Sequence, residues 1–266
     1  MAFDRISFTT DYGLDDGFVA ACEGVIAGIA PAVRVLHVTH TVAPRDVRRG
    51  AAVLAATVPY LPPAVHLAVV DPGVGTARRG VVLLAGESAL VGPDNGLLLS
   101  AADALGGVRA AHELTAAEYR LPVVSRTFHG RDVFAPAAAH LALGVPAAAF
   151  GPALDPAGLV RLPPPLAEVT ADGVRTEVGT VDRFGNLSLA TDLAVPAGTG
   201  VTVVLGDRRH PATAATTFGD VEPGALLVFT DSAGRLAVAV RDGSAAEHTG
   251  ATAGDEVSVL FRSQDR

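Results

Sequence analysis

Apolar residues in the first 160 positions form either continuous short runs or segments with an apolar residue at every third or fourth position. Residues 65–70 are apolar except for His66, which is typical of a strand buried on both faces of a parallel sheet. The spaced segments predict helices that cover such a sheet. Together they favour an α/β domain with a mainly parallel, right-handed sheet flanked by helices. The expected strands are 6–10, 33–38, 65–70, 81–85 and 89–91, and the expected helices are one capped by Asp15 or Asp16 and ended by Pro31, one opened by Asp46 and closed by Pro59, and those over 97–105 and 132–143.

The pattern changes at residues 161–166, where three consecutive prolines form a stiff connector that a helix cannot include. Beyond it, short β-like runs alternate with turns rich in Gly, Asp and Ser, and no helix is predicted. We therefore expect an α/β substrate-binding and catalytic domain over 1–160 and a smaller antiparallel β domain, barrel-like or sandwich-like, over 167–266. Its expected strands are 173–181, 187–190, 201–205, 225–230, 236–240 and 256–261.

Composition narrows the class of partner. The chain has 266 residues, a formal net charge of −8, 5% aromatic residues and no Trp. Nucleic-acid binding favours a basic face and stacking aromatics, so we expect no nucleic-acid partner. No apolar run approaches the ~20 residues of a membrane span and the first residues lack a signal-peptide pattern, so we expect no membrane association and a cytoplasmic location. Cys22 is the single cysteine, which excludes an intrachain disulfide, and we expect it in the core.

Asp71 follows the apolar run 65–70 directly, and a glycine-rich turn then leads to Arg78. In open α/β sheets, ligands bind beyond the carboxyl ends of the strands, where Asp71 is expected to lie. An acidic residue and a guanidinium at this position could serve a reaction. They could equally form a structural pair that pins a loop, and the spacing alone does not separate the two interpretations.

His129 and Asp11 are expected at similar positions. His129 precedes the predicted helix 132–143, and the positive end of a helix dipole favours a neutral imidazole. A neutral ring suits a base or a group that polarises water, although a histidine that only caps the helix is the alternative. Asp11 ends the first predicted strand, where α/β proteins often bind a ribose diol.

Other polar clusters are less specific. The turns 182–186 and 231–235 are equally well explained as surface turns. The glycines of 73–75 match neither the dinucleotide-binding nor the P-loop spacing. A metal site is conceivable but no tight ligand spacing is present, so we expect none. The side chains that could supply metal ligands are Asp11, Asp15, Asp16, His37, His40, Asp71, His129 and Asp132.

Five ordered motifs resemble those of the S-adenosylmethionine hydrolases that use water as the nucleophile, relatives of the fluorinating and chlorinating enzymes. The resemblance spans nearly the whole chain. It implies an α/β domain with a β-barrel-like domain, a homotrimer, and active sites between the first domain of one subunit and the second domain of its neighbour. The motifs are Thr9-Thr10-Asp11-Tyr12-Gly13, the run 70–76 with Arg78, the run 91–97, the run 128–136, and Asp182-Arg183-Phe184-Gly185-Asn186.

The resemblance also implies roles in the first domain. Asp71, Arg78 and His129 match the set credited with binding and activating the attacking water or hydroxide. Asp11 matches the carboxylate that binds the ribose 2′- and 3′-hydroxyls. Halogenating relatives carry a non-acidic residue where this chain has Asp71. Because a carboxylate would repel halide, the difference favours water as the nucleophile.

In the second domain the resemblance places Asp182 and Ser232 near the methionine amine and carboxylate, Asn186 near the adenine, and the turn 241–246 at the adenine edge. The expected reaction converts S-adenosyl-L-methionine to adenosine and L-methionine without a cofactor or metal. Two alternatives stay open, a halogenase acting on the same substrate and a non-catalytic nucleoside-binding protein.

Overall fold

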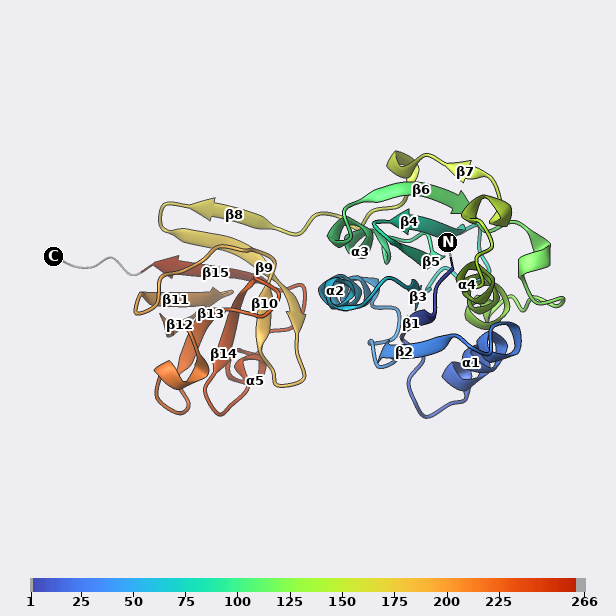
Figure 1. The fold of residues 1–266 in the computed structure, drawn as a ribbon. Helices are drawn as coiled ribbons and strands as arrows, with labels where there is room; N and C mark the ends of the chain where they lie inside the picture. The colour runs from blue at the N-terminus through green and yellow to red at the C-terminus, as the bar shows by residue number, and fades with distance from the viewer. Residues whose placement is uncertain (1, 262–266) are drawn as a thin grey trace. The chain divides into compact units, whose positions relative to one another are not determined.

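The computed structural model describes residues 2–261, which form two compact units (Figure 1). The first unit ends at Leu162 and the second begins at Pro163. This boundary falls within the proline-rich segment 161–166. Met1 and residues 262–266, the outer ends of the two expected domains, lie outside the described range.

The first unit is built on a seven-stranded mixed sheet with the order β2-β1-β3-β5-β4-β6-β7. The pairings β1–β2, β1–β3 and β3–β5 are parallel, whereas β4–β5, β4–β6 and β6–β7 are antiparallel. The prediction of a mainly parallel sheet is therefore wrong for half of it, because the β4–β5 hairpin reverses the chain. The strands are β1 (Arg5–Thr10), β2 (Arg34–Thr39), β3 (Val65–Val69), β4 (Gly80–Ala85), β5 (Ser88–Pro93), β6 (Val108–Glu113) and β7 (Ala153–Leu154).

Four short helices pack on this sheet, α1 (Phe18–Ile29), α2 (Val47–Thr57), α3 (Leu99–Ala104) and α4 (Ala135–Ala142). Apolar residues of α1 and α4 share one buried cluster with the sheet, and those of α2 and α3 share another. Cys22 of α1 is fully buried, as expected.

The helix starts distinguish correct from incorrect capping predictions. Asp46 caps α2, since its Oδ1 accepts a hydrogen bond from the Arg49 backbone N–H at 2.9 Å, which confirms that prediction. Neither Asp15 nor Asp16 caps α1, which starts after Gly17 without a side-chain cap. The predicted helix 132–143 begins earlier, as a π-helical turn η3 (Gly130–Phe134) that continues into α4.

The second unit is a closed seven-stranded barrel, in which β9 pairs with both β15 and β10 and so completes the ring β9-β10-β14-β13-β12-β11-β15. The barrel form of the predicted β domain is therefore confirmed. Two details of the prediction are wrong: β12 pairs with β13 in parallel, and a five-residue helix, α5 (Ala245–Thr249), is present. The strands are β8 (Ala167–Thr170), which pairs with β9 outside the ring, β9 (Gly173–Val181), β10 (Leu187–Leu189), β11 (Gly200–Leu205), β12 (Arg208–Ala214), β13 (Leu226–Thr230), β14 (Leu236–Val240) and β15 (Glu256–Phe261).

Alternation with a period of two explains the barrel core. Val201, Val203 and Leu205 of β11 are buried, and the residues between them are partly exposed. The same pattern holds Val257 and Val259 of β15 inside. The expected strands 201–205 and 256–261 show this alternation in the sequence, whereas β13 and β14 are continuous apolar runs.

Candidate active site

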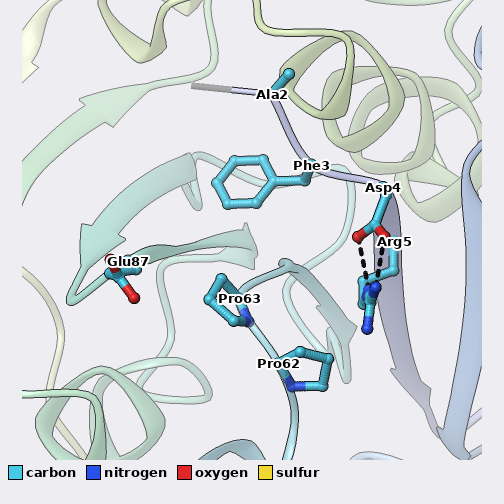
Figure 2. Close-up of a pocket in the computed structure, with 7 residues that line it drawn as sticks. All are labelled: Ala2, Phe3, Asp4, Arg5, Pro62, Pro63 and Glu87. Atoms are coloured by element: carbon cyan, nitrogen blue, oxygen red, sulfur yellow. Dashed lines mark hydrogen bonds and ion pairs between the residues drawn. The ribbon is translucent and has the colours of Figure 1, made fainter.

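A hollow in the first unit lies at the end of the sheet where the parallel strands begin (Figure 2). Residues next to the starts of β1, β3 and β5 line it, and Asp4 and Arg5 form an ion pair there. The predicted catalytic residues instead lie at the opposite end of these strands, where Asp71 follows β3, Arg78 precedes β4 and His129 precedes η3. The lining residues are Ala2, Phe3, Asp4, Arg5, Pro62, Pro63 and Glu87.

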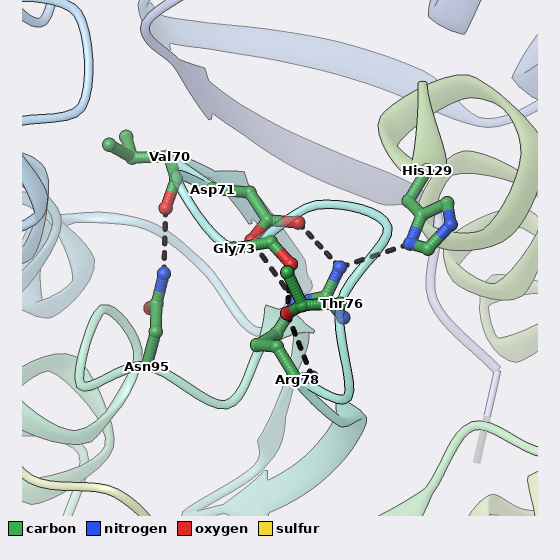
Figure 3. A network of polar contacts seen from close by, with 7 residues as sticks. All are labelled: Val70, Asp71, Gly73, Thr76, Arg78, Asn95 and His129. Atoms are coloured by element: carbon green, nitrogen blue, oxygen red, sulfur yellow. Dashed lines mark hydrogen bonds and ion pairs between the residues drawn. The ribbon is translucent and has the colours of Figure 1, made fainter. Parts of the chain in front are cut away.

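The turn between β3 and β4 brings Arg78 back onto Asp71 (Figure 3). The Thr76 hydroxyl donates to the Gly73 carbonyl at 2.7 Å and tightens the turn. Gly75 has a φ of +76°, and a Cβ atom there would lie 2.4 Å from the Arg126 carbonyl oxygen. Glycine is required at this position, because any side chain would push the turn away from the segment that precedes His129.

Asp71 and Arg78 form a two-bonded ion pair. Arg78 Nε donates to Asp71 Oδ1 at 3.1 Å and Nη2 donates to Oδ2 at 2.5 Å. The Arg78 and Asp71 side chains are only 9% and 6% exposed. The guanidinium also lies 5.1 Å from the centroid of the Phe134 ring. Burial makes each charge depend on the other, since an unpaired charge at such a site is costly.

His129 joins this pair through Arg78, whose Nη2 lies 3.0 Å from His129 Nδ1. A guanidinium can only donate, so Nδ1 accepts and the proton of the neutral ring resides on Nε2. Burial, and then the charge of Arg78, lower the pKa of His129 below its usual 6.5. The sequence predicts a neutral imidazole because of the helix dipole; in the structure, burial is the largest cause of the lowered pKa. The trio thus combines a carboxylate, a guanidinium and a neutral imidazole in direct contact.

Asp11 lies at the same end of the sheet as Asp71, beyond the carboxyl ends of the parallel strands. It follows Thr10, which pairs with Val69 at the end of β3, so Asp11 and Asp71 follow neighbouring parallel strands. Asp11 Oδ2 accepts a hydrogen bond from the Arg45 backbone N–H at 2.8 Å, which orients the carboxylate.

Tyr12 and Asp132 had no catalytic or substrate-binding role assigned from the sequence, although Asp132 was among the possible metal ligands. Tyr12 packs edge-on against Phe128, and a Cβ atom at Gly130 would lie 1.9 Å from the Tyr12 hydroxyl oxygen. Asp132 is fully buried, and its Oδ2 accepts a hydrogen bond from the Ser125 backbone N–H at 2.8 Å. The contact of Tyr12 with Phe128 joins segments far apart in the chain, so no local pattern marked it, whereas Asp132 contacts Ser125 only seven positions away.

The proposed metal-ligand candidates do not gather at one point. His37 Nδ1 and His40 Nε2 are hydrogen bonded to each other at 2.7 Å, and His37 Nε2 contacts Glu23 at 3.1 Å. Over residues 2–261, no three His, Cys, Asp or Glu side chains form a group that could hold a metal ion. Over the same range, no helix is long and apolar enough to cross a membrane.

In the second unit, Asp182 and Asn186 lie together in the β9–β10 turn. Asp182 Oδ1 accepts from the backbone N–H groups of Phe184 and Asn186, at 2.8 and 2.9 Å, and Oδ2 accepts from Asn186 Nδ2 at 2.8 Å. Gly185 contacts the predicted adenine turn 241–246, since its carbonyl accepts from the Ala246 N–H at 2.9 Å.

Ser232 lies in a different turn, between β13 and β14, and is exposed. That turn is held by Asp231, whose Oδ1 accepts from the Ala233 and Arg235 N–H groups and whose Oδ2 accepts from the Ser188 hydroxyl at 2.7 Å. Asp182, Asn186 and Ser232 are thus not one cluster of side chains: the first two bond each other, and the third occupies a separate turn.

The structure is that of a two-domain protein: a mixed α/β unit, which holds the buried acid–guanidinium–imidazole contact, precedes a closed β-barrel in the chain. Residues 6–151 match the SAM hydroxide adenosyltransferase N-terminal domain, and residues 176–258 match the C-terminal domain of that family. The chain therefore belongs to the SAM hydroxide adenosyltransferase family.

Three individual proteins illustrate what the chain is similar to. A Salinispora tropica protein named (R)-S-adenosyl-L-methionine hydrolase is 62% identical over 256 residues, which cover 96% of this chain and 97% of the relative. A solved structure of an uncharacterized conserved protein from Thermotoga maritima has a TM-score of 0.88 and 38% identity, over 96% of this chain and 100% of that one. A fluorinase of an Actinoplanes species is 29% identical over 269 residues, which cover 88% of this chain and 90% of the relative.

Proposed function

We propose that this chain hydrolyses S-adenosyl-L-methionine to adenosine and L-methionine by in-line attack of water or hydroxide on ribose C5′. The observation that carries the proposal is the direct contact of Asp71, Arg78 and His129 beside the end of β3. Family membership and the name of the Salinispora tropica relative support the same reaction. Because the name of that relative carries the stereodescriptor R, the experiment below tests the two sulfonium epimers of the substrate separately.

The reaction balances without a cofactor. A water oxygen forms a bond to C5′, the C5′–S bond breaks, and its electron pair stays on sulfur as a neutral thioether. The leaving group therefore needs no proton, and the water gives up one proton. The protein's main task is to hold the water in line with the C5′–S bond, about 3–3.5 Å from the carbon.

Each member of the trio has a role that follows from its hydrogen bonds. Arg78 aligns the other two groups, because it donates to both. His129 Nδ1 is occupied by Arg78, so its Nε2–H would donate to the water oxygen and orient it. Asp71 is then the group that accepts the proton, since each carboxylate oxygen has a second lone pair.

The remaining predicted residues would bind the substrate. Asp11 would accept hydrogen bonds from the ribose diol with its oriented carboxylate. Asp182 and Ser232 would bind the methionine amine and carboxylate, and Asn186 the adenine. We further propose a homotrimer, which size-exclusion chromatography with light scattering tests directly.

The decisive experiment incubates the purified protein with each sulfonium epimer of S-adenosyl-L-methionine in water enriched in heavy oxygen. Label in the adenosine 5′-hydroxyl is the expected result. Label-free adenosine, or none at all, would reject attack by water on C5′. Added chloride or fluoride should give no 5′-halo-5′-deoxyadenosine, and formation of that product would favour the halogenase.

Variants separate catalysis from binding. Asp71→Ala and His129→Ala should each lower kcat by about 100-fold or more. Asp4→Asn is the matched control, since it removes an exposed acid–guanidinium pair at the opposite edge of the same sheet and should leave kcat unchanged. Tight binding without turnover, unaffected by the first two substitutions, would instead support a nucleoside-binding protein.

A further inference from the structure

The loop that follows β5 contacts the first end of the Asp71–Arg78 turn. Asn95 Nδ2 donates to the Val70 carbonyl at 2.8 Å (Figure 3). The same side chain accepts, through Oδ1, a hydrogen bond from the Leu97 backbone N–H at 3.2 Å. Both ends of the amide are therefore used, and the side chain has one defined orientation.

The preceding residue of the loop contacts the other end of the turn. Asp94 Oδ2 accepts from Arg79 Nε at 3.0 Å and from Nη2 at 2.5 Å, and the Asp94 N–H donates to the Arg79 carbonyl at 2.9 Å. The Asp94 side chain is only 4% exposed, and its Oδ1 accepts from the Val160 N–H at 2.9 Å. This end of the turn is firmly attached to the body of the unit.

The two anchored residues are direct chain neighbours of the trio. Val70 precedes Asp71, and Arg79 follows Arg78. Residues 75–77 of the turn are exposed and lie outside the hydrophobic core. The position of the Asp71 carboxylate therefore depends on how the Val70 peptide group is held.

We propose that Asn95 is a positioning residue for hydrolysis, which fixes the Asp71 carboxylate through the Val70 carbonyl while the Arg79–Asp94 pair fixes the Arg78 end. This inference rests on the proposed function. The hydrogen bonds of the Asn95 side chain go to Val70 and Leu97 and not to the trio, so its effect is on geometry and not on the chemistry of a reacting group.

The structure offers a matched control on the same two strands. The Ser88 hydroxyl, at the start of β5, accepts from the Ala64 N–H, just before β3, at 3.3 Å. Ser88→Ala thus removes a buried side-chain hydrogen bond between the same two strands, at the end opposite to the trio. Any general loss of stability should appear in both variants, whereas misplacement of Asp71 should appear only at Asn95.

The experiment compares Asn95→Ala, Asn95→Asp and Ser88→Ala by steady-state kinetics with S-adenosyl-L-methionine. Asn95→Asp keeps the acceptor for Leu97 but loses the donor to Val70, so it serves if the alanine variant does not fold. Each Asn95 variant should lower kcat by about 10- to 100-fold with KM nearly unchanged, the scale of a misplacement of about 1 Å. A kcat equal to that of Ser88→Ala, or a loss confined to KM, would overturn the proposal.

A second readout does not need turnover. The NMR titration of His129, assigned with a His129→Gln variant, should move to lower pH in Asn95→Ala, because the Asp71 carboxylate raises the imidazole pKa and a displaced Asp71 would raise it less. An unmoved titration would overturn the positioning role. Absence of turnover in the wild type would instead reject the proposed function, and the titration would still test Asn95.

Discussion

The buried pair of Asp71 and Arg78 can be tested by removing each charge singly and then both together, with Asp71→Asn, Arg78→Met and the double variant. An asparagine cannot replace Asp71 smoothly. Both of its terminal atoms would face guanidinium N–H donors, at the present 3.1 and 2.5 Å, so the amide NH₂ would oppose a donor in either orientation. Arg78→Met keeps an unbranched apolar chain beside the Phe134 ring but leaves the carboxylate without its partner.

The magnitude follows from burial. Both side chains are less than 10% exposed, at 9% and 6%, so the small values of surface ion pairs do not apply. Removing one partner of a buried pair costs about 3 kcal/mol of the free energy of unfolding. The double variant leaves no charge unpaired, but the buried amide that replaces the Asp71 carboxylate loses the guanidinium partner, so it should cost about 3 kcal/mol and not the ~6 kcal/mol of two additive losses. The double-mutant cycle should therefore give a coupling energy of about 3 kcal/mol.

Urea unfolding of all four proteins measures this coupling, and kcat on S-adenosyl-L-methionine is followed in parallel. The double variant should be nearly as stable as either single variant and yet catalytically as poor. Single costs that add within about 0.5 kcal/mol would refute the reasoning, because they would mean that neither charge depends on the other. A double variant with restored activity would refute the catalytic role of the pair.

Two further predictions concern a glycine and a buried histidine. Gly75→Ala should lose about 2 kcal/mol or more, since it combines a φ of +76° with a 2.4 Å approach to the Arg126 carbonyl. The matched Gly224→Ala, with a φ of +80° and no atom within 4 Å, should lose only the backbone share and keep its kcat, and equal losses would contradict the role of the close contact. Burial lowers the pKa of His66 from 6.5 to about 4, so the unfolded chain binds a proton between these values while the native state does not. Stability should be full above pH 6.5 and fall by about 3 kcal/mol towards pH 4, which urea unfolding across that range measures, and a His66→Gln variant with an equally steep fall would show that His66 is not the cause.

Most of the predicted strands carry apolar side chains that define a buried surface, although β2, which was also predicted, has no fully buried residue. The predicted strand 65–70 corresponds to β3, Val65–Val69, whose side chains are buried on both faces of the sheet. Val108–Glu113 and Arg208–Ala214 carry charged residues and, in the second case, a proline, so no apolar run marked β6 or β12. They form strands because their backbones pair with β4 and β11. That pairing depends on the tertiary fold, so the local sequence of either segment could not predict it.

In the candidate site, too, the contact between nearby residues could be expected from the sequence and the contact with a distant residue could not. Asp71 and Arg78 are seven positions apart, so a turn could be expected to join them. His129 is 51 positions beyond Arg78, and its 3.0 Å contact depends on where η3 packs against the sheet. The capping error at Asp15 and Asp16 has a similar origin, because Phe18 starts α1 where its ring packs against Phe128.

The charge balance of the trio favours water over halide. Asp71 compensates the charge of Arg78, and burial keeps His129 neutral, so no uncompensated cation is left to attract an anion. A sulfonium substrate brings its own positive charge, which a site of zero net charge tolerates better than a cationic one. Water needs no countercharge and offers two donors and two acceptors, which match a carboxylate that accepts and an Nε2–H that donates. A halide could use only the donor, and it would face the carboxylate at the same time. The distribution of donors and acceptors around Arg78 therefore selects a neutral nucleophile before any contact with the sugar is considered.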